Sequence, residues 1–350
     1  MPDPLLYVQA IAAAAVAAAA IVLVLLGLRR SPTAAWLNAA CGIAVAAGSM
    51  VGLRVEDLQV AFPPASGLDR LLTVVLPAAL LIEWIAASPA LATRFAWGLR
   101  IGLILLTPRI LLHGSVYVSD PEAWTAWQAA ISFGVCWALL ASCWGLMFTL
   151  GSRRPGISIP LSLGLAIGSA AATVMMAGYL KGGEAAMPMV AALLATAVVV
   201  WGMARRRRGV SGDGPSTRTP TAGSVLPPVL IAVGVIGLFG VLFIGHFFGR
   251  VSGGRAVAIC LAPLLCWVTE IAALKHQRPW VVGTIRLCLV AVPLVITLAL
   301  AKRDFDRDLA PLVVMERKNT VQWSGCRVCW RGCGSPEIPP SGVLAAGKGR

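Results

Sequence analysis

Two glutamate–arginine pairs lie within apolar stretches of this sequence. Glu83 precedes Arg100 by 17 residues, and Glu270 precedes Arg286 by 16. At the rise of an α-helix, Glu83 and Arg100 lie roughly 7 Å inside the same membrane face, one on each arm of a helical hairpin. An ionisable side chain among lipid tails costs a few kcal/mol unless it is paired or reaches water. We therefore expect each glutamate to pair with its arginine.

Such pairs suggest two different uses. The sequence favours structural ion pairs that fix the register of each hairpin, with separate extension of both side chains toward the headgroups as a variant. The functional alternative is a charged lining of a cytoplasm-facing cavity that handles an anion or a proton, because intramembrane ionisable residues often mark pathways. Glu83, Arg100, Glu270 and Arg286 are therefore the candidate intramembrane site residues.

The composition predicts an integral membrane protein. Of the 350 residues, 58% are hydrophobic and only 13% are charged, whereas soluble domains carry about 25% charge. The apolar residues form blocks long enough to span a bilayer. We predict an all-α, polytopic transmembrane bundle of about ten spans, at 5–28, 34–53, 70–87, 95–113, 124–150, 157–180, 187–203, 226–246, 255–274 and 280–301.

Basic residues alternate between the predicted loops. The odd-numbered loops hold 12 arginines and lysines, including the run Arg205 to Arg208, whereas the even-numbered loops hold five. By the positive-inside rule, the odd loops are cytoplasmic and both termini lie outside, in the plasma (inner) membrane. This bias also accounts for the net charge of +14, and the basic patches with interleaved aromatics that nucleic-acid binding needs are absent.

The chain divides by composition into four parts. Residues 1–203 form a first membrane helix set of about seven spans, 204–225 a flexible cytoplasmic linker, 226–301 a second set of about three spans, and 302–350 a largely disordered tail. The tail carries Cys326, Cys329 and Cys333, one ligand short of a structural zinc site. Six further cysteines are predicted to be small buried hydrophobes: Cys41, Cys136, Cys143, Cys260, Cys266 and Cys288.

The two charged hairpins also suggest an internal repeat. A proline precedes each glutamate by six or seven residues, Pro77 and Pro263, and another follows each arginine by eight or seven, Pro108 and Pro293. The offset is six spans, so spans 1–4 and 7–10 would be parallel copies, a known transporter architecture. Chance could also produce these landmarks. Proline inside a helix frees backbone carbonyls, so kinks are expected at Pro77, Pro263 and Pro293.

Small residues recur at helical spacing in three spans. Such faces allow close approach of neighbouring helices, and packing is the expected role. The three sets are Gly134, Ala138 and Ser142; Gly164, Gly168 and Ala172; and Gly234, Gly237 and Gly240.

No chemical motif assigns an activity. The sequence has no Walker A loop and no clustered histidines of the kind that metal-centred membrane enzymes use, so no catalytic, cofactor or metal residues are predicted and an enzyme is the least supported class. The first hypothesis is a secondary transporter or permease of a small solute. The solute would be an anion if the paired charges bind it. The alternative is a non-catalytic membrane subunit or scaffold that binds a helix-packing protein partner. The lipid bilayer is the expected partner in either case.

Overall fold

The computed structural model describes residues 4–29, 33–88, 92–115, 117, 124–153, 156–210, 227–271 and 279–308. The chain divides into two compact units, residues 1–302 and residues 303–350. The predicted cysteine tail and most of the predicted linker lie outside the described residues.

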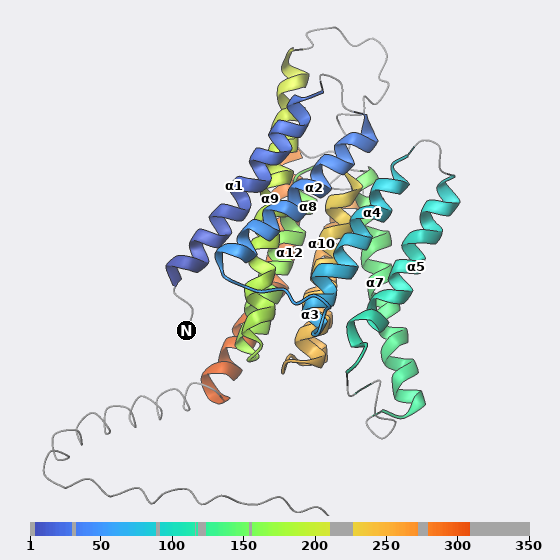
Figure 1. The fold of residues 1–350 in the computed structure, drawn as a ribbon, viewed down its shortest axis with the longest axis vertical. Helices are drawn as coiled ribbons and strands as arrows, with labels where there is room; N and C mark the ends of the chain where they lie inside the picture. The colour runs from blue at the N-terminus through green and yellow to red at the C-terminus, as the bar shows by residue number, and fades with distance from the viewer. Residues whose placement is uncertain are drawn as a thin grey trace, which may run out of the picture. The chain divides into compact units, whose positions relative to one another are not determined.

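The described residues form helices joined by turns and short loops, which confirms the all-α prediction (Figure 1). Among the described residues, nine helical runs are long and apolar enough to cross a bilayer, and one of them is α11 continued by η3. The elements are α1 (Pro4–Gly27), α2 (Ala34–Val55), α3 (Gly67–Arg70), η1 (Leu71–Val75), α4 (Leu76–Ala86), α5 (Thr93–Leu112), α7 (Ala126–Arg153), α8 (Ser158–Met176), α9 (Leu180–Val210), α10 (Pro228–Phe247), α11 (Gly253–Leu261), η3 (Ala262–Glu270) and α12 (Pro279–Asp308).

The predicted spans and the observed helices differ in three places. The ninth predicted span is composed of α11 and the 3₁₀ segment η3 rather than of one α-helix. The third span is predicted as one continuous helix, but the structure divides it into three segments: α3, the π-helical segment η1 and α4. The seventh, predicted over 187–203, extends from Leu180 to Val210 as α9. Its last residues therefore continue as helix into the stretch expected to begin the linker.

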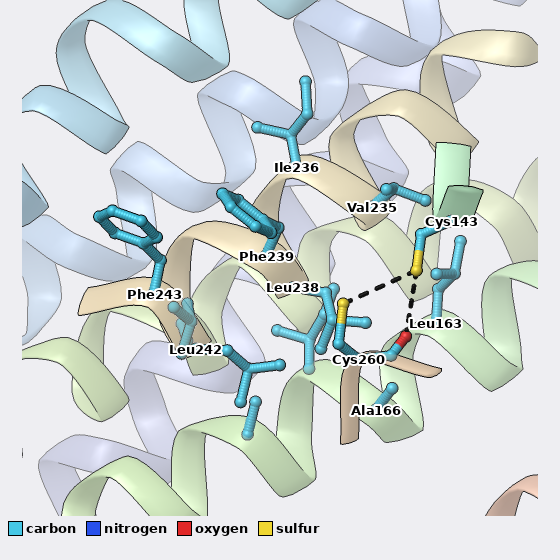
Figure 2. Packing of buried hydrophobic residues seen from close by; sticks show 14 of the residues in the cluster. Cys143, Leu163, Ala166, Val235, Ile236, Leu238, Phe239, Leu242, Phe243 and Cys260 are labelled. Atoms are coloured by element: carbon cyan, nitrogen blue, oxygen red, sulfur yellow. Dashed lines mark hydrogen bonds between the residues drawn. The ribbon is translucent and has the colours of Figure 1, made fainter. Parts of the chain in front are cut away.

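The central helix of the first unit is α10. Its most apolar 18-residue window is 94% buried, against 22–61% for the other eight candidate spans. A helix that is apolar on every side is suited to such a position, because each face can pack against another helix. The neighbours that pack on α10 include α8, α4, α7, α9 and α2. Figure 2 shows side chains of α10 within this core: Val235, Ile236, Leu238, Phe239, Leu242 and Phe243.

The glycines of α10 allow this close packing. A β-carbon at Gly234 would lie 2.9 Å from Leu163 of α8, and one at Gly237 would lie 2.5 Å from Met189 of α9. One at Gly240 would overlap Leu71 of η1. The prediction that this glycine set serves packing is confirmed, and each glycine receives a different neighbour.

A second close contact joins α1, α2 and α9. A β-carbon at Gly52 would lie 2.5 Å from Pro188 and 3.0 Å from Ala14. One turn earlier, a β-carbon at Gly48 would lie 2.7 Å from the Ala18 β-carbon and 2.8 Å from the Ala14 carbonyl oxygen. These neighbours are backbone atoms and alanines, which cannot rotate away.

Replacing Gly48 by alanine should therefore lower the free energy of unfolding by about 1–2 kcal/mol, because α1 must shift to admit the methyl group. Unfolding in mixed detergent and SDS would measure the change. The matched control is Gly102→Ala in α5, where a β-carbon would meet nothing within 4 Å. Alanine should be neutral or slightly stabilising there, given its higher helix propensity. Equal effects at both sites would contradict the packing argument.

The other small-residue faces behave differently from one another. Gly164 lies against Leu194 of α9, so the packing prediction is confirmed there. A β-carbon at Gly134 or Gly168 would meet no neighbouring atom within 4 Å, and Gly134, Ala138 and Ser142 are all exposed. Among the described residues, this face of α7 therefore has no helix packed against it.

Four of the six span cysteines are buried, as predicted. Cys143 of α7 and Cys260 of α11 meet in the core, with their sulfurs 3.7 Å apart and the Cys143 thiol also donating to the Cys260 carbonyl oxygen (Figure 2). Cys136 is only partly buried, and Cys288 is exposed on α12. The prediction is wrong for Cys288, because an apolar neighbourhood in the sequence does not distinguish a core-facing position from a lipid-facing one.

Candidate functional site

The α4–α5 hairpin brings Glu83 and Arg100 into direct contact. Arg100 Nε donates to Glu83 Oε1 at 2.7 Å, and Arg100 Nη2 donates to Glu83 Oε2 at 2.8 Å. This is the two-point geometry that matches a guanidinium to a carboxylate. Glu83 is fully buried and Arg100 is 6% exposed, so these side chains do not extend separately to the headgroups.

Aromatic rings enclose the guanidinium of Arg100. Its central carbon lies 5.2 Å from the ring centre of Trp97, one turn earlier in α5, and 4.5 Å from that of Phe148 in α7. Ring faces attract a cation, and the attraction is stronger where water is excluded. The pair thus connects three helices, α4, α5 and α7.

Asn38 of α2 completes the first pair's surroundings. Its Nδ2 donates to the Glu83 carbonyl oxygen at 2.7 Å, and its Oδ1 accepts from the Val229 backbone N–H at 2.9 Å. Val229 lies in the first turn of α10, where backbone N–H groups have no partner within the helix. One amide therefore connects α2, α4 and α10. This role of Asn38 was not predicted, although an isolated asparagine in an apolar span was the available signal.

The second pair also forms, with different partners. Arg286 of α12 donates through Nη2 to Glu270 Oε1 at 3.2 Å and through Nε to Thr269 Oγ1 at 2.7 Å. Its Nη1 donates to Ser158 Oγ, in the first turn of α8, at 3.3 Å. Arg286 therefore connects η3, α8 and α12. The two hydroxyl partners, Thr269 and Ser158, were not predicted.

The two pairs differ in access to their surroundings. The Glu83 and Arg100 side chains are 1% and 7% exposed, whereas the Glu270 side chain is 16% exposed and that of Arg286 4%. The contact distance is also longer at the second pair. Both side chains of the first pair are therefore shut off from solvent, whereas the carboxylate of the second pair, at the end of η3, is partly exposed.

Irregular helix precedes both glutamates. The π-helical segment η1 ends at Val75, two residues before Pro77, and α4 then leads to Glu83. The 3₁₀ segment η3 contains Pro263 and ends at Glu270. A proline lacks the N–H that closes a helical turn, which permits such departures. Pro293, in contrast, lies within uninterrupted α-helix in α12, so the kink expected there is not matched by a break in the helix.

Both pairs present arginine N–H groups to oxygen acceptors. Arginines presenting N–H donors toward carboxylate and hydroxyl oxygens can also hold the carboxylate or phosphate of a solute. Within the described ranges, no three His, Cys, Asp or Glu side chains converge as a metal site.

No protein-family model, curated protein or solved structure matches the chain.

Proposed function

We propose that this multi-pass membrane protein is a secondary transporter of a small anionic solute, and that Arg286 is the residue that binds the anion. The observation that carries the proposal is the irregular helix next to each charged pair. Interrupted helices at corresponding positions of two halves are the strongest pointer to a transporter's binding site. Here η1–α4 and α11–η3 hold those positions, each leading to a glutamate paired with the next helix.

The two pairs would then have separate tasks. The closed Glu83–Arg100 pair holds its hairpin together, because breaking a fully buried pair leaves an uncompensated charge. The more exposed Glu270 acts as an internal competitor: it occupies Arg286 until the carboxylate or phosphate of a solute replaces it. Thr269 and Ser158 would keep the guanidinium in place during the exchange. Both are neutral hydroxyls that accept hydrogen bonds from Arg286, one from η3 and one from α8.

The sidedness follows from the arginine-rich loops. We place those loops in the cytoplasm and both termini outside, in the plasma (inner) membrane. The second pair lies near the loop between η3 and α12, which is an odd-numbered loop by this count. Arg286 would then meet solute from the cytoplasmic side, and the parallel repeat of spans 1–4 and 7–10 would underlie the matching hairpins.

Currents in proteoliposomes test the proposal. Purified protein would be challenged with concentration jumps of chloride, phosphate, acetate and larger carboxylates on a solid-supported membrane. If one anion gives a current, Arg286→Gln should weaken its apparent affinity about 10- to 100-fold through the lost charge-assisted bond, and Arg286→Lys should restore part of it. Glu270→Gln should strengthen apparent affinity, because the competing carboxylate becomes neutral.

Arg94→Gln is the matched control, since Arg94 is an exposed arginine at the start of α5. It should leave the currents unchanged. Currents that are insensitive to Arg286→Gln in a folded protein, or none for any anion, would contradict the proposal.

A scaffold is the second candidate, and the open face of α7 favours it. Gly134, Ala138 and Ser142 form an exposed small-residue face of the kind that membrane helices use for close association. Absence of flux across the panel, together with stable co-purification of a partner that Gly134→Leu releases, would favour the scaffold over the transporter.

A further inference from the structure

Two carboxylates, Glu56 and Glu184, come together where α1, α2 and α9 meet. Gly52 of α2 packs against Pro188 of α9 and Ala14 of α1. Glu56 follows Gly52 by four residues, and Glu184 precedes Pro188 by four. Because α2 and α9 run in opposite directions (Figure 1), both glutamates lie one turn beyond this contact toward the same end. Tyr7, two turns before Ala14 in α1, lies at that end as well.

Glu56 has no hydrogen-bond partner at this position. Both of its carboxylate oxygens are buried, and neither is bonded to any group in the structure. Its backbone N–H, by contrast, is satisfied as the C-cap of α2, donating to the carbonyl oxygens of Arg54 and Gly52. A buried carboxylate without donors or a counter-charge is costly in its ionised form.

The charged groups on the packed helices do not relieve this cost. Glu184 acts on Glu56 as a like charge, and both carboxylates act in turn on the half-buried Tyr7. The basic neighbours in sequence, Arg54 on α2 and Lys181 on α9, are exposed, as is Asp57. No salt bridge joins either of these two basic residues to Glu56 in the described ranges.

We propose that Glu56, whose two carboxylate oxygens are buried without a hydrogen-bond partner, is a proton-binding site, with Glu184 as the like charge that favours the bound proton. The site is separate from the proposed anion site at Arg286, and neither depends on the other. Burial first, and then the proximity of Glu184, raises the pKa of Glu56 from 4.5 to about 7.

Protonation of Glu56 should make the stability of the folded protein depend on pH. The folded protein binds the Glu56 proton more tightly than the unfolded chain does, because its pKa is raised on folding. The stabilisation is therefore fully present below about pH 4.5 and is lost as the pH rises through about 7. Above that pH the folded state contains a buried carboxylate next to Glu184.

Thermal unfolding of the full chain in detergent, at pH 5.5 and at pH 8.5, tests this. The wild-type Tm should fall by about 2–4 °C more between the two values than the Tm of Glu56→Gln. Glu184→Gln should show a smaller fall than the wild type, because the like charge is removed. Asp57→Asn is the matched control: Asp57 is the exposed next residue, and its backbone φ of 54° suits asparagine. It should keep the wild-type pH dependence.

Infrared difference spectra supply a second measurement that does not depend on stability. A protonated carboxyl band should appear as the pH is lowered through 7, persist in Asp57→Asn and be missing in Glu56→Gln. A wild-type pH dependence retained by folded Glu56→Gln, or a carboxyl band unaffected by that change, would overturn the proposal.

Discussion

Glu83→Gln should lower the free energy of unfolding by about 3–5 kcal/mol, because it leaves the Arg100 guanidinium charged and buried without its carboxylate. The double variant Glu83→Gln with Arg100→Gln should be less destabilised than Glu83→Gln alone, since no uncompensated charge remains. Reversible unfolding in SDS and detergent mixtures would give all four corners of the double-mutant cycle.

The second pair provides an internal comparison for this cycle. Glu270→Gln and Arg286→Gln should show weaker coupling, because Glu270 is more exposed and its contact with Arg286 is longer. Additive effects at Glu83 and Arg100 would mean that the bidentate contact contributes nothing to stability. The first pair would then not hold the α4–α5 hairpin together.

Asn38→Leu should lower the free energy of unfolding by about 2–3 kcal/mol. The change keeps the size of the side chain but removes two hydrogen bonds at once, leaving the Val229 N–H buried without its acceptor. We also expect it to loosen the junction of α2, α4 and α10, which faster hydrogen exchange at the start of α10 would report.

Ser49→Ala on the same helix is the control for Asn38. The Ser49 hydroxyl donates only to the Val45 carbonyl oxygen one turn earlier, a local bond of little consequence for tertiary structure. A near-zero effect is expected. If Asn38→Leu proved equally neutral, the asparagine would not connect these helices in solution.

Much of the architecture could be predicted from local sequence. Long apolar blocks dictate membrane helices because unpaired backbone groups cannot be left in lipid, and nine of the ten predicted spans coincide with helices long and apolar enough to cross a bilayer. The Glu83–Arg100 and Glu270–Arg286 contacts could also be anticipated, because a fixed rise per residue places both members of a pair at one depth and few residues of sequence separate their helices.

Which faces meet was decided only by the tertiary structure. A membrane helix can be apolar toward its neighbours and toward lipid alike, so hydropathy marks α10 as a span but not as the buried centre. The same ambiguity conceals the exposed faces of Gly134 and Cys288. The links through Asn38, Thr269 and Ser158, and the isolated carboxylate of Glu56, join residues from helices far apart in the chain. Their roles follow from the packing of whole helices, which no local pattern in the sequence encodes.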